Sequence, residues 1–353
     1  MNKNQWAALA PYTMSMEKSL DAQGQLQSLP LLQVRGLSKY FPIFSKGFLS
    51  KKIGDVRAVD NVSFDLFPGE TLGIVGESGS GKTTTGRTIL RAIEPTAGEV
   101  LFNCEDHIID IAKVPHHQLK SLRTKMQMIF QDPFSSLNPR MTVGDIVSEP
   151  LVIHKMAKGS ELEDRVAAIL EKVGLKPEYK TRYPHAFSGG QRQRIGIARA
   201  LIMNPLLVVA DEAVSALDVS VQAQVINLMK DLQDELGLTY IFVAHDLSVV
   251  RHICDKVAVM YGGRIVELAP TEEIFTDPKH PYTQALLRSV PNPNPDIKMA
   301  FGLEGEVADP SKLPQGCAFH PRCRDCFAEC SHIRPEILKL GASSRSVACL
   351  KYK

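Results

Sequence analysis

The sequence of 353 residues lacks any long uninterrupted hydrophobic run. No run approaches the roughly 18 apolar residues of a membrane span, and residues 1–30 have no basic start followed by an apolar stretch. Neither a transmembrane helix nor a secretory leader is therefore expected. We expect the chain to stay in the cytosol, with any membrane association made through a partner.

A strong charge of one sign is also absent. Lys and Arg total 41 against 39 Asp and Glu, which leaves a net charge of +2. No basic patch interleaved with aromatic residues is present, so nucleic acid is not an expected partner. The length suggests about two domains, and a hydrophobic content of 44% is ordinary for a packed globular protein.

One glycine-rich loop has the pattern of a phosphate-binding site. Residues 76–83 read GESGSGKT, after the apolar run TLGIV and before residues with helical spacing. In this context Lys82 is expected to reach the β- and γ-phosphates and the Thr83 hydroxyl to bind Mg²⁺. An unliganded glycine turn is the alternative, but the flanking strand and helix favour nucleotide binding. The expected contacts are Gly76, Ser78, Gly79, Ser80, Gly81, Lys82, Thr83 and Thr84.

A second phosphate-binding signal follows about a hundred residues later. Ser188, Gly189, Gly190 and Gln191 open the helical stretch RQRIGIARALI. The amino end of a helix attracts anions through its free N–H groups and dipole. Two such signals in one chain predict that two subunits clamp a nucleotide between them.

Polar side chains end several apolar runs. Asp211 and Glu212 follow LLVVA, where a carboxylate can hold Mg²⁺ and Glu212 can act as general base. Gln131 ends the run KMQMIF, within reach of Mg²⁺ or the attacking water, and His245 ends TYIFVA, where it can contact the γ-phosphate. Alone, His245 is more often a core histidine and Gln131 an ordinary loop residue.

The coarse pattern indicates an α/β fold. Residues 31–41 read as a strand and turn, 41–55 as a loop and 56–70 as two half-buried strands. The runs before Asp211 and His245 are typical of strands buried under helices on both sheet faces. Residues 139–185 read as mostly helical, and 257–269 as a hairpin with a Gly-Gly turn.

The motifs GESGSGKT, FQDP, FSGGQRQR, SALD and AHD resemble, in their order, those of ATP-binding cassette (ABC) ATPases over residues 31–270. The resemblance implies a P-loop NTPase with a RecA-like core, an antiparallel β subdomain and a helical subdomain at 139–185. It implies Walker A at 76–83, the Q-loop at Gln131, the signature at 188–191 and Walker B at 206–211. It further implies a D-loop ending at Asp218, a switch His245, a catalytic Glu212, and adenine stacking on Phe41, with Tyr40 as the alternative. Ala213 and Val214 depart from the usual Pro-Thr pair.

Longer stretches narrow the resemblance. FQDPFSSLNPRMTVGDIVSEPL and HPYTQALLRSVPNPNP are similar to the ATPase subunits of bacterial oligopeptide, dipeptide and nickel importers, and most to the second, F-type subunits of dipeptide permeases. This implies an ATP-sandwich dimer with a paired ATPase subunit, expected to be a heterodimer. The other implied partners are two transmembrane permeases, whose coupling helices meet Gln131 and the helical segment, and an extracytoplasmic solute-binding protein. The implied location is the cytoplasmic face of the bacterial inner membrane, as a peripheral protein.

The region 271–353 lies outside the ATPase core and holds five of the seven cysteines. Disulfides are not expected in a reducing cytosol, whereas four thiolates can hold zinc or an iron–sulfur cluster. The resemblance implies Cys317, Cys323, Cys330 and Cys349 as ligands of a [4Fe–4S] cluster in some members. A zinc site in which Cys326 substitutes, and free thiols, stay open as alternatives. Residues 1–30 are expected to form a loosely ordered extension.

Two classes of function remain after these observations. One is a transport ATPase subunit that powers the uptake of di- or oligopeptides, with nickel chelates, opines or glutathione as alternative cargo. The other is a soluble cassette ATPase that needs no permease. The single cassette, the helical segment and the HPY region favour transport.

Overall fold

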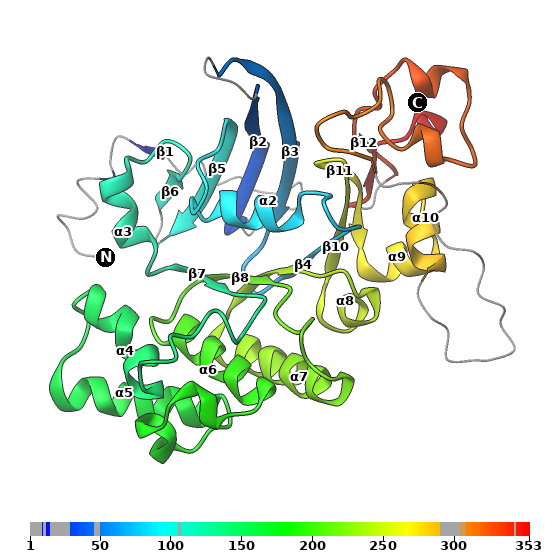
Figure 1. The fold of residues 1–353 in the computed structure, drawn as a ribbon. Coiled ribbons are helices and arrows are strands. Elements are labelled where there is room, and N and C mark those ends of the chain that lie inside the picture. Colours follow the sequence, from blue (N-terminus) through cyan, green and yellow to red (C-terminus); the bar gives the residue numbers. More distant parts are fainter. Residues whose placement is uncertain are drawn as a thin grey trace, which may run out of the picture. The chain divides into compact units, whose positions relative to one another are not determined.

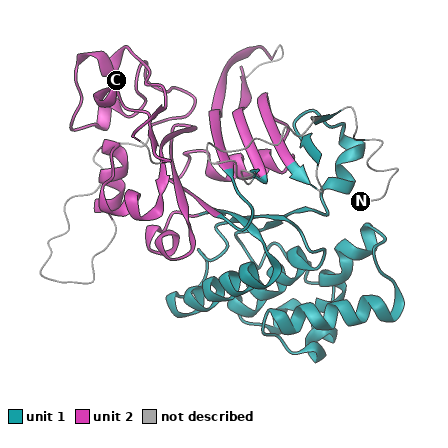
Figure 2. Cartoon of the chain, turned by 180° about the vertical axis from the view of Figure 1, so that it is seen from behind, with its two compact units in different colours: residues 1–31, 66–70, 103–243 teal, residues 32–65, 71–102, 244–353 magenta. Residues whose placement is uncertain are grey.

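The computed structural model describes most of the chain and divides it into two compact units (Figure 2). Unit 1 comprises residues 1–31, 66–70 and 103–243, and unit 2 comprises 32–65, 71–102 and 244–353. Both units are assembled from segments distant in sequence, so the predicted boundaries at 30 and 270 stay predictions. The described residues are 9, 12–14, 29–45, 50–104, 107–289, 305, 308–341 and 344–353.

The centre of unit 1 is a set of parallel strands (Figure 1). Strand β8 (Leu207–Asp211) lies between β7 (Met126–Ile129) and β9 (Thr239–Val243), with Val208 opposite Tyr240. Every residue of β8 and β9 is buried. The expectation that these apolar runs are fully buried strands is confirmed.

Helices make up most of the rest of unit 1. The predicted helical segment contains α4 (Val143–Ile153) and α5 (Gly159–Lys172), followed by α6 (Gly189–Leu201) and α7 (Val219–Leu236). Helix α4 begins with a capping box between Thr142 and Asp145, which satisfies two backbone N–H groups at its start. Shorter elements are β1 (Thr13–Met14), β6 (His107–Asp110), α3 (Leu119–Leu122) and the 3₁₀ turns η2 (His116–Gln118), η3 (Pro177–Thr181) and η4 (Pro184–Ala186).

Unit 2 contains a second set of strands around β10 (Lys256–Tyr261). Strand β10 pairs in parallel with β4 (Thr71–Val75) and antiparallel with β11 (Arg264–Pro270). Gly262 and Gly263 form the tight turn between β10 and β11, so the predicted hairpin is confirmed. Two short strands, β12 (Leu338–Lys339) and β13 (Ser346–Val347), extend the β11 edge.

A separate sheet in unit 2 joins strands in the order β5-β2-β3. Its strands are β2 (Leu32–Phe44), β3 (Lys52–Leu66) and β5 (Ala97–Cys104), whose last two residues belong to unit 1. The prediction of two strands within 56–70 is wrong, because β3 is continuous. Asn61 adopts a φ of 59° inside β3, and its N–H bonds to the Ser38 hydroxyl, which interrupts the alternation without ending the strand.

The helices of unit 2 are short. They are α2 (Lys82–Ile89), α8 (Leu247–Ile253), α9 (Thr271–Thr276) and α10 (Pro281–Arg288), with 3₁₀ turns η5 (His320–Arg322), η6 (Ala328–Ser331) and η7 (Leu350–Tyr352) near the end of the chain. None of the helices in the described residues is long and apolar enough to cross a membrane.

Candidate nucleotide site

The glycine-rich loop of unit 2 connects a buried strand to a helix, as the sequence predicts. Strand β4 is buried throughout, and α2 begins directly after Gly81. Gly81 has a φ of 100°, and a Cβ there would lie 2.0 Å from the carbonyl oxygen of Ala58. No other residue fits this position, because both the backbone conformation and the space exclude a side chain.

Lys82 and Ser80 are buried at the centre of this loop. The Nζ of Lys82 donates hydrogen bonds to the carbonyl oxygens of Gly76 at 2.8 Å and Glu77 at 3.0 Å. The Ser80 hydroxyl oxygen is buried without a hydrogen-bond partner among the described residues. A buried cation and an unsatisfied hydroxyl within one loop fit a phosphate group, which accepts from both.

The other predicted residues of the loop are more accessible. Ser78 and Gly79 are exposed, while Thr83 and Thr84 are partly exposed in the first turn of α2. Their backbone N–H groups therefore lie at an accessible helix start, which suits an anionic ligand. The donor set of this loop fits a nucleotide triphosphate with Mg²⁺.

The two aromatic candidates for adenine stacking lie on β2. The Phe41 side chain is 38% exposed, with the Lys39 ammonium 5.0 Å from its ring centre. The Tyr40 hydroxyl donates to Asp60 at 2.6 Å, and the Arg57 guanidinium lies over its ring at 5.5 Å. Burial, followed by the hydrogen bond to Asp60, raises the pKa of Tyr40. Because Tyr40 is already engaged, Phe41 has the more accessible ring.

In unit 1, the end of β8 places two carboxylates in succession. Asp211 is the last residue of the strand and is fully buried. Glu212 adopts a φ of 48°, its N–H donates to the Val243 carbonyl at 2.9 Å, and its carbonyl accepts from the Ser215 hydroxyl. Left-handed backbone is uncommon for a glutamate, and strained residues of this kind cluster at functional sites.

The predicted partners of Glu212 are divided between the units. Gln131, in unit 1, donates from Nε2 to Oε2 of Glu212 at 2.8 Å, so the structure brings these two together. His245 belongs to unit 2, where it is exposed between β9 and the Asp246 cap of α8. The Thr83 and Asp211 side chains proposed for Mg²⁺ likewise belong to different units.

The second phosphate signal forms the start of α6. The Ser188 hydroxyl accepts from the Gln191 N–H at 3.3 Å, and the Gln191 side chain accepts from the Ser188 N–H at 3.1 Å. This capping box connects Ser188 and Gln191, the first and last residues of the signature. A Cβ on Gly190 would lie 2.4 Å from Cγ1 of Val221, so Gly190 allows α6 to pack closely on α7. Gly189 is partly exposed.

The turn between β8 and α7 contains the remaining predicted residue. Asp218 is exposed at the start of α7, and its carbonyl accepts from the N–H groups of Val221 and Gln222. Ala213 and Val214, which depart from the usual family pair, are both buried. Their apolar side chains therefore contribute to packing in unit 1.

The five C-terminal cysteines lie in unit 2. The N–H of Cys317 donates to the Cys330 carbonyl at 2.8 Å, and burial followed by the neighbouring cysteines raises the pKa of the Cys317 thiol to about 11. Cys326 is exposed. However, the described residues include no group of three or more His, Cys, Asp or Glu side chains placed to hold a metal ion. The four predicted ligands lie near one another, but their thiols are not arranged to hold a metal ion. They are Cys317, Cys323, Cys330 and Cys349. The [4Fe–4S] prediction therefore gains no support from the structure.

The HPY sequence, residues 280–282, forms the start of α10. The His280 ring accepts from the Tyr282 N–H at 3.0 Å, and Pro281 occupies the first helical position. Buried Glu267 accepts from the N–H groups of Lys279 and His280. Burial lowers the pKa of His280 to about 4, which leaves it neutral and able to accept.

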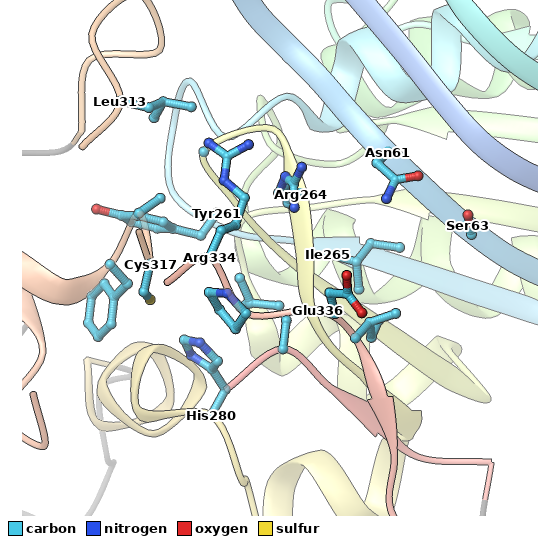
Figure 3. A pocket seen from close by; sticks show the side chains of 17 residues that line it. Asn61, Ser63, Tyr261, Arg264, Ile265, His280, Leu313, Cys317, Arg334 and Glu336 are labelled. Carbon is cyan, nitrogen blue, oxygen red and sulfur yellow. The ribbon is translucent and has the colours of Figure 1, made fainter. Parts of the chain in front are cut away.

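A cavity of about 270 Å³ in unit 2 lies between β3, the β10–β11 hairpin and the C-terminal segment (Figure 3). Arg264 and Arg334 line it, and both donate to Asp60, at 2.8 Å and 3.2 Å. Since Asp60 also accepts from Tyr40, it joins the C-terminal segment to the β2 aromatic residues. Asp60 and Arg334 carried no sequence signal, because only the fold brings them together.

Comparison with known families agrees with this geometry. A family model described as "ABC transporter" matches residues 59–215, and one described as "Oligopeptide/dipeptide transporter, C-terminal region" matches residues 266–330. The oligopeptide transport ATP-binding protein AppF of Bacillus subtilis is 53% identical over 326 residues, which are 91% of this chain and 97% of that protein. This chain belongs to the ATP-binding protein family of ABC transporters.

Other relatives of the ABC family support the same assignment. The dipeptide transport ATP-binding protein DppF of Haemophilus influenzae is 48% identical over 92% of this chain and 97% of its own length. Among solved structures, the dimeric, post-hydrolysis structure of the ATP-binding cassette MJ0796 bound to ADP and Pi matches with a TM-score of 0.58 and 29% identity. It covers 68% of this chain and 98% of that one. CbiO1 from Clostridium perfringens, part of the ABC transporter complex cbiONQ, matches with a TM-score of 0.59, 28% identity and coverage of 70% and 91%. The α/β cassette ATPase fold is thereby confirmed.

Proposed function

We propose that this chain is the ATP-hydrolysing subunit of a bacterial importer of di- or oligopeptides. The observation that carries the proposal is the coexistence of a complete set of cassette motifs with the C-terminal region matched by the oligopeptide/dipeptide transporter model. Relatives that match over nearly their full length are named as oligopeptide and dipeptide transport ATP-binding proteins.

The proposed chemistry assigns a role to each site residue. Lys82 and Ser80 bind phosphate oxygens, supported by the burial of both groups and the unsatisfied Ser80 hydroxyl among described residues. Thr83, Asp211 and Gln131 would hold Mg²⁺, which would neutralise charge on the phosphates. Phe41 stacks on adenine.

Hydrolysis is proposed to depend on Glu212 as general base. Its carboxylate accepts a proton from water as that water attacks the γ-phosphorus, and the γ-phosphoryl group leaves ADP as inorganic phosphate. The Gln131 hydrogen bond holds Glu212 in place in unit 1. His245 contacts the γ-phosphate in this proposal.

The complete site is proposed to need a second ATPase subunit. Ser188, Gly189, Gly190 and Gln191 would cap a nucleotide bound to the partner, with Asp218 at the same interface. Support comes from the exposure of Ser188 and Asp218 and from the likeness to a dimeric cassette that binds ADP and Pi. The family's peptide importers make a heterodimer the expected arrangement.

Coupling to transport is proposed to use four of the exposed apolar residues of unit 1. These side chains are exposed, although the Arg192 guanidinium lies over the Phe134 ring at 4.3 Å, and large exposed apolar groups often mark protein interfaces. They are Phe134, Val152, Ile153 and Met156. Two permease subunits would bind here at the cytoplasmic face of the inner membrane, and a solute-binding protein would deliver the cargo outside.

Reconstitution with its permeases and binding protein would test this function. We expect peptide-stimulated ATP hydrolysis, and vesicle uptake of labelled dipeptide that stops in the Glu212→Gln variant. Stimulation by nickel chelates, opines or glutathione instead of peptides would replace the cargo assignment. Full activity of the isolated chain, without co-purifying permeases, would favour the soluble ATPase.

The C-terminal cysteines form a separate hypothesis. A [4Fe–4S] cluster on Cys317, Cys323, Cys330 and Cys349, a zinc site and free thiols are distinguished by metal and sulfide analysis of anaerobically purified protein. About four iron and four sulfide per chain supports the cluster. One zinc per chain without sulfide supports the zinc site. The absence of both metal and sulfide supports free thiols.

A further inference from the structure

The glycine-rich loop of unit 2 contains an acidic residue, Glu77, directly after Gly76. A carboxylate in this loop opposes the binding of a triphosphate, because like charges repel strongly where water is limited. In the structure this carboxylate is paired. The Nη1 of Arg322 donates to Oε2 of Glu77 at 2.7 Å, and Nη2 donates to Oε1 at 3.0 Å.

This ion pair has the geometry of a strong one. A bidentate Arg–carboxylate pair fixes both direction and distance. The Arg322 side chain is only 6% exposed and that of Glu77 19%, so solvent screens the pair weakly. The hydrogen bond to Glu77 also raises the pKa of Arg322, so its positive charge is permanent.

The backbone of Glu77 is held as well. Its N–H donates to the Tyr282 hydroxyl at 2.8 Å, and its carbonyl accepts from Lys82. Tyr282 is fully buried at the start of α10, where His280 and Glu267 fix the helix start. The HPY sequence thus places a hydroxyl against the phosphate loop.

An aromatic cluster supports both contacts. Tyr261, Tyr282 and Phe319 have ring centres 4.7 to 5.3 Å apart. The Arg322 guanidinium lies 5.9 Å from the Tyr261 ring centre, within range of a cation–π contact. Arg322 ends η5, between Cys317 and Cys323, so the C-terminal segment determines where the guanidinium lies.

We propose that Arg322 is a positioning residue for ATP binding, which neutralises Glu77 and, together with Tyr282, fixes the conformation of the phosphate loop. The inference rests on the proposed function, because it assumes that the loop binds ATP. The C-terminal segment is then part of the nucleotide site and contributes to ATP affinity without touching the nucleotide.

A charge-pair rescue tests this role by equilibrium titration of each folded variant with a fluorescent ATP analogue. Arg322→Met leaves the Glu77 carboxylate unpaired, and we expect the Kd to rise about tenfold. Adding Glu77→Gln removes that charge, so the double variant should bind within about twofold of the parent. Arg322→Lys, which keeps the charge but loses the fork, should weaken binding about threefold.

Arg345→Met is the matched control. Arg345 is equally buried in unit 2, and its side chain pairs with Glu273 and Asp277, outside the phosphate loop. It should lower the melting temperature while the Kd for the analogue stays unchanged. An Arg322→Met Kd equal to that of this control, or a double variant no tighter than the single, overturns the proposal.

Two further outcomes are separable. A parent protein that does not bind the analogue contradicts the proposed function itself, whatever the variants do. If Arg322→Met does not fold, Arg322→Lys carries the test: its weakened binding must be restored by Glu77→Gln, and failure of that restoration overturns the inference.

Discussion

Gln131 donates a hydrogen bond to the carboxylate of Glu212 at 2.8 Å, from the end of one parallel strand to the end of the next. Glu212 also has a left-handed φ of 48°, held by the Val243 carbonyl. The structure therefore fixes both the backbone and the side chain of this glutamate before any partner binds. A side chain held in this way suits a group that must orient a water molecule.

Replacing Glu212 with Gln tests its proposed role as general base. The amide keeps the shape and the Gln131 contact but cannot accept a proton, so we expect kcat to fall by at least about 100-fold. ATP binding should persist, and the variant mixed with its paired ATPase subunit should accumulate as an ATP-bound dimer in size-exclusion chromatography. Phosphate release at the parental rate would contradict the assignment.

The unsatisfied hydroxyl of Ser80 predicts opposite effects on stability and binding. Ser80→Ala removes a buried polar atom that has no partner among the described residues, so unfolding free energy should stay constant or rise by up to about 1 kcal/mol. The Kd for ATP should rise about threefold or more, because a phosphate donor is lost. Chemical denaturation and nucleotide titration measure the two quantities. A loss of stability with unchanged ATP binding would show that Ser80 serves the fold instead.

Gly190 is expected to serve helix packing at the signature. Gly190→Ala forces a methyl group against Val221 and should cost about 1–3 kcal/mol of stability together with ATPase activity. Combining it with Val221→Ala makes room and should restore both. Gly196→Ala in the same helix is the control, because a Cβ there meets nothing within 4 Å and should be neutral or stabilising.

A stable but inactive Gly190→Ala/Val221→Ala protein would give a different result. It would mean that Gly190 has no side chain because a ligand approaches its backbone closely, and not because α6 contacts α7.

His280 predicts a pH-dependent stability. Its pKa is about 4 in the folded chain against an ordinary 6.5, because burial disfavours the charged ring. The unfolded chain binds more protons between these values, so stability is present at pH 7 and falls by up to about 3 kcal/mol as the pH drops toward 4.

His280→Asn keeps a helix-capping acceptor but does not titrate. We expect its unfolding free energy, measured by denaturant at pH 7 and pH 4.5, to vary less than that of the parent. Burial also lowers the pKa of His154. His154 is present in both proteins, so its contribution to the pH dependence cancels in the comparison. Identical pH profiles would contradict the role of His280.

The sequence predicts most of the nucleotide site because its parts are local. A strand, a glycine loop and a helix start are encoded within residues 71–89, and the capping box of Ser188 needs only the next three residues. Buried strands were equally predictable from their continuous apolar runs. The continuity of β3 through Asn61 was not predictable, because a single left-handed residue inside a strand interrupts the alternation as a turn would.

The contacts that sequence reasoning missed are those between distant segments. Glu77 and Arg322 are 245 positions apart, and Asp60 meets Arg334 across 274. Glu77 occupies a position where the glycine motif allows any residue, so the sequence does not show that its carboxylate is paired. Likewise, the HPY residues indicate a family but not that Tyr282 bonds to the phosphate loop.

The mutual bonds of Ser188 and Gln191 have a consequence for an encounter between two subunits. In the isolated chain this turn is already formed, because the Ser188 oxygen accepts the Gln191 N–H while its own O–H remains a donor. An arriving γ-phosphate would therefore meet an oriented hydroxyl, and neither bond of the capping box has to break. The turn is rigid before the subunits meet, so little conformational entropy is lost there when they associate.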